Sequence, residues 1–255
     1  MQNKVGLKLR EFSDSGRKGI AWLIDPDDIH SPIQFEGQLR EAVELKIDFF
    51  FLGGSLIQQN TIGDIIKFIR SITEDIPTVI FPGNSLQFSP LADAILFLSL
   101  ISGRNPDLLI GQHVSIAPIL DKSKVEVLPT GYMLVDGGQA TSAHYISQTI
   151  PLPNHHPELA VATALAGYFL GLQYFYLDAG SGSPHPVSAE LIKAVKKRIK
   201  SPLIVGGGLN SVEKIRTAFE SGADLAATHF TAQPGTTSHQ NISLTSRQVT
   251  VESAL

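Results

Sequence analysis

The sequence contains no cysteine, no excess of basic residues and no long apolar run, and each of these absences excludes a class of protein. Without cysteine there are no disulfides, no thiolate metal sites and no cysteine nucleophile. Acidic and basic residues number 24 and 20, so a formal net charge of -4 gives no basic surface for nucleic acid. No apolar run approaches the ~18 residues of a membrane span, and residues 1–10 lack the apolar core of a signal peptide. We therefore expect a cytoplasmic protein with no transmembrane segment and no nucleic-acid partner.

What remains is the pattern of a globular α/β protein. The chain has 255 residues, 43% of them hydrophobic, which suits one α/β barrel or two small domains. Short β-rich apolar runs alternate with segments whose apolar residues recur at three- and four-residue spacings. The runs predict eight strands, at residues 19–25, 47–52, 78–82, 94–99, 132–136, 174–178, 203–206 and 223–228. The periodic segments predict helices at residues 33–46, 61–73, 107–120, 158–172, 187–199 and 212–221.

The positions of the glycine-rich turns favour a closed barrel over an open sheet. A doubly wound sheet normally places its glycine-rich phosphate turn after the first strand. Here such turns follow the sixth and seventh predicted strands, where (β/α)8 barrels build phosphate sites. We predict a single (β/α)8 TIM-barrel domain over residues 1–230. Residues 231–255 are rich in Ser, Thr and Gln without helical periodicity, which predicts a polar C-terminal tail, irregular or disordered, and an irregular or incomplete eighth βα unit.

Two of these turns form a candidate phosphate site. The segment YLDAGSGSPHPV carries Gly180, Ser181 and Gly182 directly after a strand, and VGGGLNS carries Gly207 and Gly208 after the next one. Glycines let several backbone N–H groups converge on one anion, and a serine hydroxyl adds a donor. The helix that follows adds the partial positive charge of its N-terminus. The alternative interpretation is that the glycines only make tight turns.

An acidic residue at the end of the first predicted strand is a candidate metal ligand. Asp25 stands in the run LIDPDD, at a strand end where barrels place functional side chains. Mg2+ takes one or two carboxylates together with phosphate oxygens and water, and the hydroxyl of Ser55, after the second strand, is a second candidate ligand. The alternative role is the N-cap of the following helix, which Asp27, Asp28 or Ser31 could equally fill.

The histidines carry weaker signals. His155 and His156 are adjacent, and no acid in the sequence pattern accompanies them, so a solvated loop explains them better than a metal pair. His113 lies on a helical pattern, and we expect it to be an ordinary surface or core residue with satisfied hydrogen bonds.

Several segments, taken in order, carry a resemblance to a known family: LIDPD, FFFLGGSLI, TGYMLVDGGQATSAHYISQTIPLP, YFYLDAGSGSPHPV and SPLIVGGGLNS. They resemble the geranylgeranylglyceryl phosphate synthases, in the larger bacterial and archaeal branch of that family. The similarity spans residues 19–224, and the combination of motifs is specific even though glycine turns occur in many barrels. The resemblance implies a (β/α)8 barrel that uses Mg2+ to join a polyprenyl diphosphate, in particular geranylgeranyl diphosphate, to sn-glycerol-1-phosphate, which makes an ether-lipid precursor.

The resemblance also implies roles for individual residues. Asp25 and Ser55 match the metal-binding positions. The acid Asp178 would orient the acceptor hydroxyl and take its proton, with Tyr176 beside it. The positions that match the glycerol phosphate site are Tyr176, Leu177, Asp178, Ala179, Gly180, Ser181, Gly182, Gly207 and Gly208, and we add His229 and Phe230 at the end of the last strand. A long apolar groove would hold the prenyl chain, with Phe81, Phe88, Tyr132 or Tyr168 as candidate lining aromatics. The family further suggests a homodimer or larger homo-oligomer, with residues 168–170 and 96–101 as candidate contacts.

Three departures from the family pattern set the alternatives. Asp178 replaces the usual glutamate, Asp28 replaces a lysine, and His229-Phe230 replaces Gly-Asn after Thr228. A side chain shorter by one methylene draws its carboxylate back by roughly an ångström, and misplacement on that scale can cost roughly a hundredfold in rate. Two other functions therefore stay open: a phosphate-binding barrel lyase or isomerase acting on a small sugar phosphate, and a catalytically impaired homologue that binds prenyl or phosphate ligands.

Overall fold

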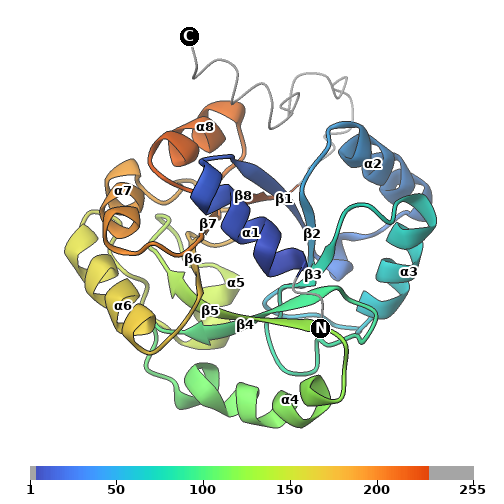
Figure 1. The fold of residues 1–255 in the computed structure, drawn as a ribbon, viewed down its shortest axis with the longest axis horizontal. Helices are drawn as coiled ribbons and strands as arrows, with labels where there is room; N and C mark the ends of the chain where they lie inside the picture. The colour runs from blue at the N-terminus through green and yellow to red at the C-terminus, as the bar shows by residue number, and fades with distance from the viewer. Residues whose placement is uncertain (1–3, 230–255) are drawn as a thin grey trace.

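Eight parallel strands close into a barrel in chain order (Figure 1). The computed structural model describes residues 4–229. β1 pairs with β2 on one side and with β8 on the other, which closes the sheet. The strands are β1 Gly19–Ile24, β2 Phe49–Leu52, β3 Thr78–Ile80, β4 Ala94–Leu100, β5 Glu126–Leu134, β6 Tyr174–Asp178, β7 Leu203–Gly206 and β8 Leu225–Thr228. The predicted (β/α)8 fold is confirmed.

Helices form a ring outside the strands, and one helix lies across the end of the barrel (Figure 1). The ring consists of α2 Pro32–Glu44, α3 Ile62–Ile72, α4 Gln112–Asp121, α6 Pro157–Phe169, α7 Ala189–Arg198 and α8 Val212–Glu220. Shorter turns are η1 Pro26–Asp28, the π-helical η2 Asp107–Gly111 that leads into α4, and α5 Ser142–Ser147. No helix among residues 4–229 is long and apolar enough to cross a membrane.

The strands read as continuous apolar runs because helices or the barrel interior bury both of their faces. In β2, all four residues of FFFL are buried. Phe49 and Phe51 point into the barrel, where small side chains from other strands, such as Ala94 and Ala227, leave room for them. Phe50 and Leu52 point outward and pack under the helices.

Helix α1, Lys4–Ser15, closes the N-terminal end of the barrel. Its buried side chains Leu9 and Phe12 pack onto the interior layer of the strands. The carboxylate of Glu126 accepts hydrogen bonds from Val5 N–H at 2.9 Å and Gly6 N–H at 3.0 Å, which satisfies two of the free donors at the start of the helix. The sequence patterns did not predict this helix.

The structure corrects two expectations. β5 begins at residue 126 and not at 132; Pro129 and Gly131, which lie inside the strand, interrupt the β-rich pattern that would have marked its first half. As the sequence pattern predicts, residues 81–93, all of them described, connect β3 to β4 without a helix. The proposed contact at residues 96–101 was wrong, since Leu96 and Leu100 are 0% and 5% exposed and belong to the barrel core. The predicted tail, and any helix that follows β8, lie outside the described residues.

Candidate active site

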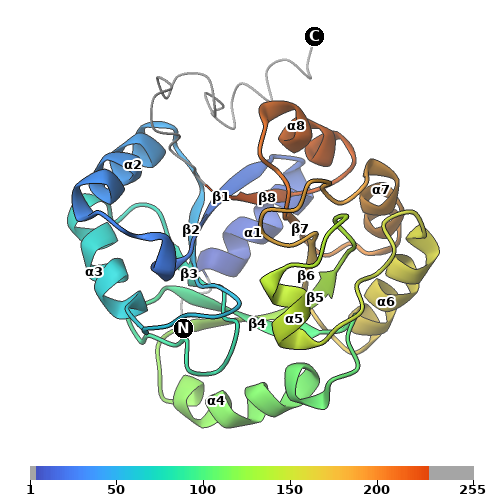
Figure 2. The ribbon, with the colours of Figure 1, turned by 180° about the vertical axis from the view of Figure 1, so that it is seen from behind.

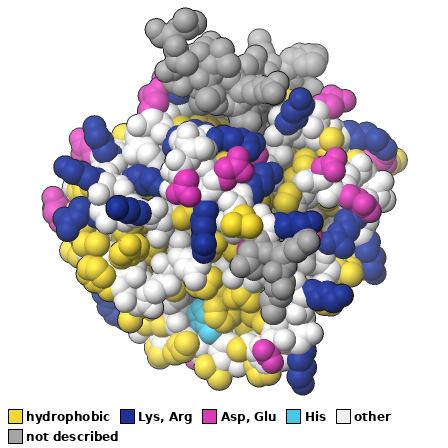
Figure 3. Space-filling view, in the orientation of Figure 1, with side chains coloured by type: hydrophobic (Ala, Val, Ile, Leu, Met, Phe, Trp, Pro, Cys, Tyr) yellow, Lys and Arg dark blue, Asp and Glu magenta, His cyan; other side chains and the backbone are white. Residues whose placement is uncertain are grey.

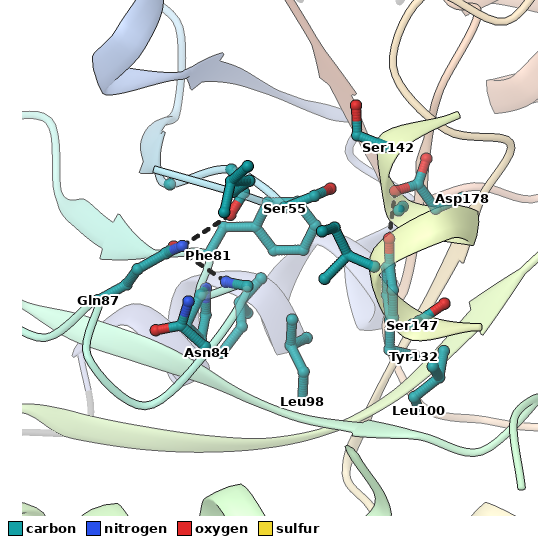
Figure 4. A pocket seen from close by; sticks show the side chains of 18 of the residues that line it. Ser55, Phe81, Asn84, Gln87, Leu98, Leu100, Tyr132, Ser142, Ser147 and Asp178 are labelled. Carbon is teal, nitrogen blue, oxygen red and sulfur yellow. Dashed lines mark hydrogen bonds between the residues drawn. The ribbon is translucent and has the colours of Figure 1, made fainter. Parts of the chain in front are cut away.

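The carboxyl ends of the strands surround a cavity of about 340 Å3 (Figure 4). Figure 2 shows the barrel from the side opposite to that of Figure 1, with the short helix α5 in front of the strands. One end of the cavity is polar and the other is apolar. The polar end is lined by Asp25, Asp28, Ser55, Asp178, Ser181, Gly207 and His229. The apolar end runs toward α4 and is lined by residues that include Ile95, Leu96, Phe97, Leu98, Leu100, Leu108 and Ile116.

Asp178, the last residue of β6, holds the most constrained carboxylate of the site. It is 7% exposed. Tyr132 Oη donates to its Oδ2 at 2.6 Å (Figure 4), and Gly180 N–H donates to its Oδ1 at 2.7 Å. Burial raises the pKa of the Asp178 carboxyl, and these two hydrogen bonds offset part of the rise. A carboxylate with fixed orientation and raised proton affinity is suited to act as a general base.

The partner Tyr132 was expected only as a groove aromatic, and its bond to Asp178 was not foreseen. Burial, and after it the charge of Asp178, raises the pKa of the Tyr132 hydroxyl well above its ordinary value. The hydroxyl therefore stays protonated and remains a donor. β5 and β6 pair with Leu134 opposite Asp178. Tyr132 lies two residues before Leu134 on β5, so its side chain is on the same interior face of the barrel as that of Asp178.

Tyr176 lies in the barrel interior and is 1% exposed. Its ring stacks on Phe81, with centroids 5.2 Å apart, and meets Tyr132 edge-on at 5.5 Å. Its hydroxyl lies against Gly206, where a Cβ would collide with it. Tyr176 is outside the cavity lining, so in this structure it supports Phe81 and Tyr132, which do line the cavity.

The two glycine turns touch each other at the ends of β6 and β7. Gly207 has φ +79°, and a Cβ at this position would lie 2.5 Å from Gly180 N and 2.7 Å from Asp178 Oδ1. Only glycine permits both the backbone conformation and this approach. Ser181 and Gly207 line the cavity. The other predicted members of this site lie in the same turns or are buried under them: Leu177, Ala179, Gly180, Gly182 and Gly208.

His229 enters the polar end from the end of β8. Its Nε2 lies 3.2 Å from Ser181 Oγ, and its ring lines the cavity. Burial lowers the pKa of the His229 imidazole, while the charges of Asp28 and Asp178 act in the opposite direction. The imidazole therefore occupies the mouth of the predicted phosphate site. Phe230, also predicted there, lies outside the described residues.

Asp25 fills the capping role considered from the sequence, and its carboxylate also lines the cavity. Its Oδ1 accepts the Asp27 N–H at 3.0 Å and caps the single turn η1, while Ser31 caps α2. Its Oδ2 lies over Gly54, where a Cβ would collide with it. Burial raises the pKa of Asp25, the Asp27 N–H lowers it, and the nearby charge of Asp28 raises it further. One oxygen is thus used in the cap, and the carboxylate still lines the cavity.

Ser55 is held by contacts between the loops after β2 and β3. The buried side chain of Gln87 accepts the Gly83 N–H and donates to the Gly54 carbonyl, each at 2.9 Å (Figure 4). Gly83 also packs so closely against Gly54 and Ser55 that a Cβ would collide with them. Gln87 was not singled out from the sequence, where a lone glutamine in a loop gives no signal.

Within residues 4–229 no three His, Asp or Glu side chains gather as a self-sufficient metal site. Asp25 and Ser55 line the same cavity and offer one carboxylate and one hydroxyl. That donor set fits Mg2+ only where phosphate oxygens and water complete the shell, which is the usual arrangement of Mg2+ in phosphate-handling sites.

The apolar end of the cavity follows from the shortness of β3. β3 pairs with β4 only at Val79–Ala94 and Ile80–Ile95, whereas β4 continues along β5 to Leu100. The cavity extends along this continuation of β4. Among the predicted groove aromatics, Phe81 and Tyr132 line it. The other two do not: Phe88 packs against the outer core, and Tyr168 is on α6 and 40% exposed.

His113 on α4 also lines this end, and the expectation that its hydrogen bonds are satisfied was wrong. One ring N–H donates to the Leu98 carbonyl, but the buried Nδ1 has no hydrogen-bond partner. Burial lowers the pKa of His113, which keeps the ring neutral at neutral pH.

Comparisons with known proteins agree on one family. The PcrB family model matches residues 17–230. A geranylgeranylglyceryl phosphate synthase from Spirosoma linguale is 51% identical over 85% of this chain and 86% of its own length. One from Pyrococcus abyssi is 36% identical over 88% of each chain. The crystal structure of (S)-3-O-geranylgeranylglyceryl phosphate synthase from Thermoplasma acidophilum in complex with sn-glycerol-1-phosphate superposes with a TM-score of 0.82, at 31% identity, over 88% of this chain and 90% of that one.

A sugar-phosphate enzyme shares only the barrel. The N-acetylmannosamine-6-phosphate 2-epimerase from Clostridium perfringens superposes with a TM-score of 0.52 at 13% identity, over 84% of this chain and 86% of that one. Likeness at that level reports the fold and carries no information on the reaction.

Proposed function

Because the chain belongs to the PcrB family, we propose that it is a prenyltransferase that joins geranylgeranyl diphosphate to sn-glycerol-1-phosphate. The observation that carries the proposal is the cavity at the carboxyl ends of the strands, in which a positioned carboxylate and two glycine turns lie at one end and an apolar channel begins at the other. A small sugar phosphate would leave the apolar end of the cavity unfilled. The product would be an ether-lipid precursor.

In this proposal the acceptor binds between the turns after β6 and β7. Backbone N–H groups around Gly180 and Gly207, with the Ser181 hydroxyl, hold its phosphate. The same turns hold Asp178 through the Gly180 N–H, so the phosphate site and the base form one rigid unit. The His229 imidazole, whose Nε2 lies 3.2 Å from Ser181 Oγ, would donate a ring N–H to the phosphate.

The donor diphosphate would lie toward Asp25 and Ser55, with its prenyl chain along β4. Mg2+ bound there would neutralise the leaving diphosphate. Asp28 also lines this end, and its negative charge works against an anionic donor. That residue is therefore the feature of the chain least suited to the reaction.

The transfer forms one carbon–oxygen bond, breaks another and moves one proton. The free terminal hydroxyl of glycerol phosphate forms an ether bond to the first carbon of the prenyl chain, and the bond from that carbon to the diphosphate oxygen breaks. Carbocation character develops on the allylic carbon, and Asp178 takes the hydroxyl proton. Tyr132 holds the Asp178 carboxylate in place by donating to the oxygen that Gly180 does not use.

We also propose that the protein self-associates through the apolar surface around the end of α6. Phe169 and Leu170 are 79% and 82% exposed, an unusual position for large apolar side chains. Hydrophobic side chains gather over the part of the surface near α4 and α6, while charged side chains dominate the opposite part of this face (Figure 3). Sedimentation of the protein and of Phe169→Asp tests this: the variant is expected to sediment as a smaller species.

The function is tested by incubating the protein with sn-glycerol-1-phosphate, labelled geranylgeranyl diphosphate and Mg2+. An organic-extractable ether phosphate is expected, its formation is expected to stop when EDTA is added, and Asp178→Asn is expected to make far less of it. If the protein forms no ether product although both ligands raise its Tm, it is a binding homologue and the proposal is wrong.

A further inference from the structure

The polar end of the active-site cavity carries an excess of negative charge. In the described part of the chain, Asp25, Asp28 and Asp178 line this end, and no lysine or arginine lines the cavity. The phosphate of the acceptor would add a charge of about -1.5 to -2 at pH 7. Because like charges repel strongly in a partly desolvated site, positive charge is needed beside this phosphate. Two imidazoles line the cavity, and of these His113 lies at the apolar end and His229 at the polar end.

The ring of His229 is held between β1 and the glycine turn after β6. β8 pairs with β1 so that Thr228 lies opposite Trp22, which brings the next residue, His229, to the level of Leu23. One ring N–H of His229 donates to the Leu23 carbonyl. On the other side, Nε2 lies 3.2 Å from Ser181 Oγ. The imidazole is therefore positioned by contacts on two sides and still faces the cavity.

The charge state of His229 decides how many donors this pair offers to a phosphate. A neutral imidazole has one N–H, and the Leu23 carbonyl accepts it. Nε2 is then the bare nitrogen and accepts the Ser181 hydroxyl, so neither group is available to an anion. One added proton makes Nε2 a donor and frees the Ser181 hydroxyl to donate elsewhere. The pair thereby changes from no available donor to two.

The surroundings of the ring set burial against negative charge. Burial lowers the pKa of His229, so the ring is neutral at neutral pH in the free site. Two charged groups face it and favour the protonated form, Asp28 on η1 and Asp178 on β6. A phosphate dianion bound beside Nε2 would add a third negative group at close range, which raises the pKa of the imidazole further.

We propose that His229 takes up a proton when the phosphate of the acceptor binds, and so becomes the cation that the polar end otherwise lacks. The inference rests on the proposed function for the identity of the acceptor. The affinity for sn-glycerol-1-phosphate is then high at low pH and falls as pH rises through the pKa of His229 in the complex. Above that pH, Ser181 and His229 remain bonded to each other and bind the phosphate poorly.

The test measures binding of sn-glycerol-1-phosphate, without donor, to the full-length wild type and to His229→Gln by titration calorimetry over a range of pH. Glutamine can still donate to the Leu23 carbonyl but cannot take up a proton. The Kd of the variant is expected to exceed that of the wild type by about ten- to hundredfold at about pH 6, because a hydrogen bond to a charged group is lost. This ratio is expected to approach one at alkaline pH. Ionisation of the phosphate itself affects both proteins equally and cancels in the ratio.

A second pair of variants tests the role of Asp28. Since Asp28 favours the imidazolium, Asp28→Asn is expected to move the fall in affinity to lower pH. The matched control is Asp27→Asn, in the same turn. Asp27 lies outside the cavity lining and is not among the charges that act on His229, so this variant is expected to keep the wild-type profile.

The location of the proton is read from the wild type labelled with 15N-histidine. The imidazole whose signals are missing from the spectrum of His229→Gln is expected to change to the imidazolium pattern when the acceptor is added. Ring nitrogens that keep the neutral pattern in the complex, or a ratio of Kd values that does not change with pH, would overturn the inference. His229→Asn replaces the glutamine variant if that variant does not fold.

The outcomes separate this inference from the proposed function. If the wild type forms ether product but His229 does not gain a proton, the inference fails and the function stands. If the acceptor binds with protonation of His229, yet geranylgeranyl diphosphate and Mg2+ give no ether product, the function fails and the inference stands. Failure to bind sn-glycerol-1-phosphate at any pH would overturn both.

Discussion

Replacing Tyr132 by phenylalanine tests whether Asp178 is the base and Tyr132 its positioning residue. The change removes the hydroxyl that donates to Asp178 Oδ2 at 2.6 Å and keeps the aromatic ring against Phe81. A hydrogen bond to a charged group contributes about 1.5–3 kcal/mol. Because this bond favours the ionised carboxylate, its loss raises the pKa of Asp178 above its already raised value.

The consequence appears in the dependence of kcat/KM on pH. The base must be ionised, so the acid side of the profile moves to higher pH in Tyr132→Phe. At pH values on the acid side of the profile, the kcat/KM of Tyr132→Phe is expected to be roughly ten- to hundredfold lower than that of the wild type, since each 1.4 kcal/mol corresponds to about a factor of ten. At alkaline pH, where Asp178 is ionised in both proteins, the difference is expected to shrink.

The matched control is Tyr174→Phe, which removes a hydroxyl from β6, the strand of Asp178, near helix α1 at the opposite end of the barrel. Its acid limb is expected to coincide with that of the wild type. An acid limb that stays in place in Tyr132→Phe, with kcat/KM reduced equally at every pH, would show that Tyr132 acts through packing and not through the carboxylate.

Three further predictions follow from the same geometry. Asp178→Asn is expected to lower kcat/KM by about 10²- to 10⁴-fold. Because burial raises the pKa of Asp178, the native state holds the proton of this carboxyl more tightly than the unfolded chain does. The stability of the wild type therefore falls as pH rises from the ordinary aspartate pKa through the raised one. Tm values measured over this pH range should lose that part of the decline in Asp178→Asn, and an identical decline in both proteins would contradict the assignment. Asp25→Asn is expected to raise the Mg2+ concentration for half-maximal turnover at least about tenfold, and an unchanged Mg2+ titration would rule Asp25 out as a ligand. Gly207→Ala should cost about 1–3 kcal/mol in backbone strain and raise the KM for sn-glycerol-1-phosphate, whereas Gly171→Ala, at φ +92° with open space around it, should lose stability without a change in that KM.

The barrel was predictable because its signals are local. The apolar runs of the strands, the periodic helices between them and the late glycine turns each stand within a few residues of the sequence. Helix α1 was missed because its role depends on a partner far away: Leu9 and Phe12 pack on the floor of the barrel, and Glu126 caps the helix from a position 121 residues after Val5.

The site was predictable in its strand-end residues and not in its contacts. Asp25, Asp178 and Gly207 stand at strand ends that the sequence marks, and the barrel brings them to one cavity. The bond from Tyr132 to Asp178 depends on how β5 pairs with β6, and the start of β5 was placed too late. The apolar end of the cavity depends on where the pairing of β3 with β4 ends, at Ile80–Ile95, and the pattern of apolar residues does not reveal that position.

The most direct test of the central claim follows one oxygen atom through the reaction. The acceptor is sn-glycerol-1-phosphate with 18O in its terminal free hydroxyl, supplied with geranylgeranyl diphosphate and Mg2+, and the products are analysed by mass spectrometry. The account predicts a geranylgeranylglyceryl phosphate whose ether oxygen carries the label, with unlabelled diphosphate released. Unlabelled prenyl alcohol as the product would show that water is the nucleophile and would contradict the claim that this site is built to transfer a prenyl group to the glycerol hydroxyl.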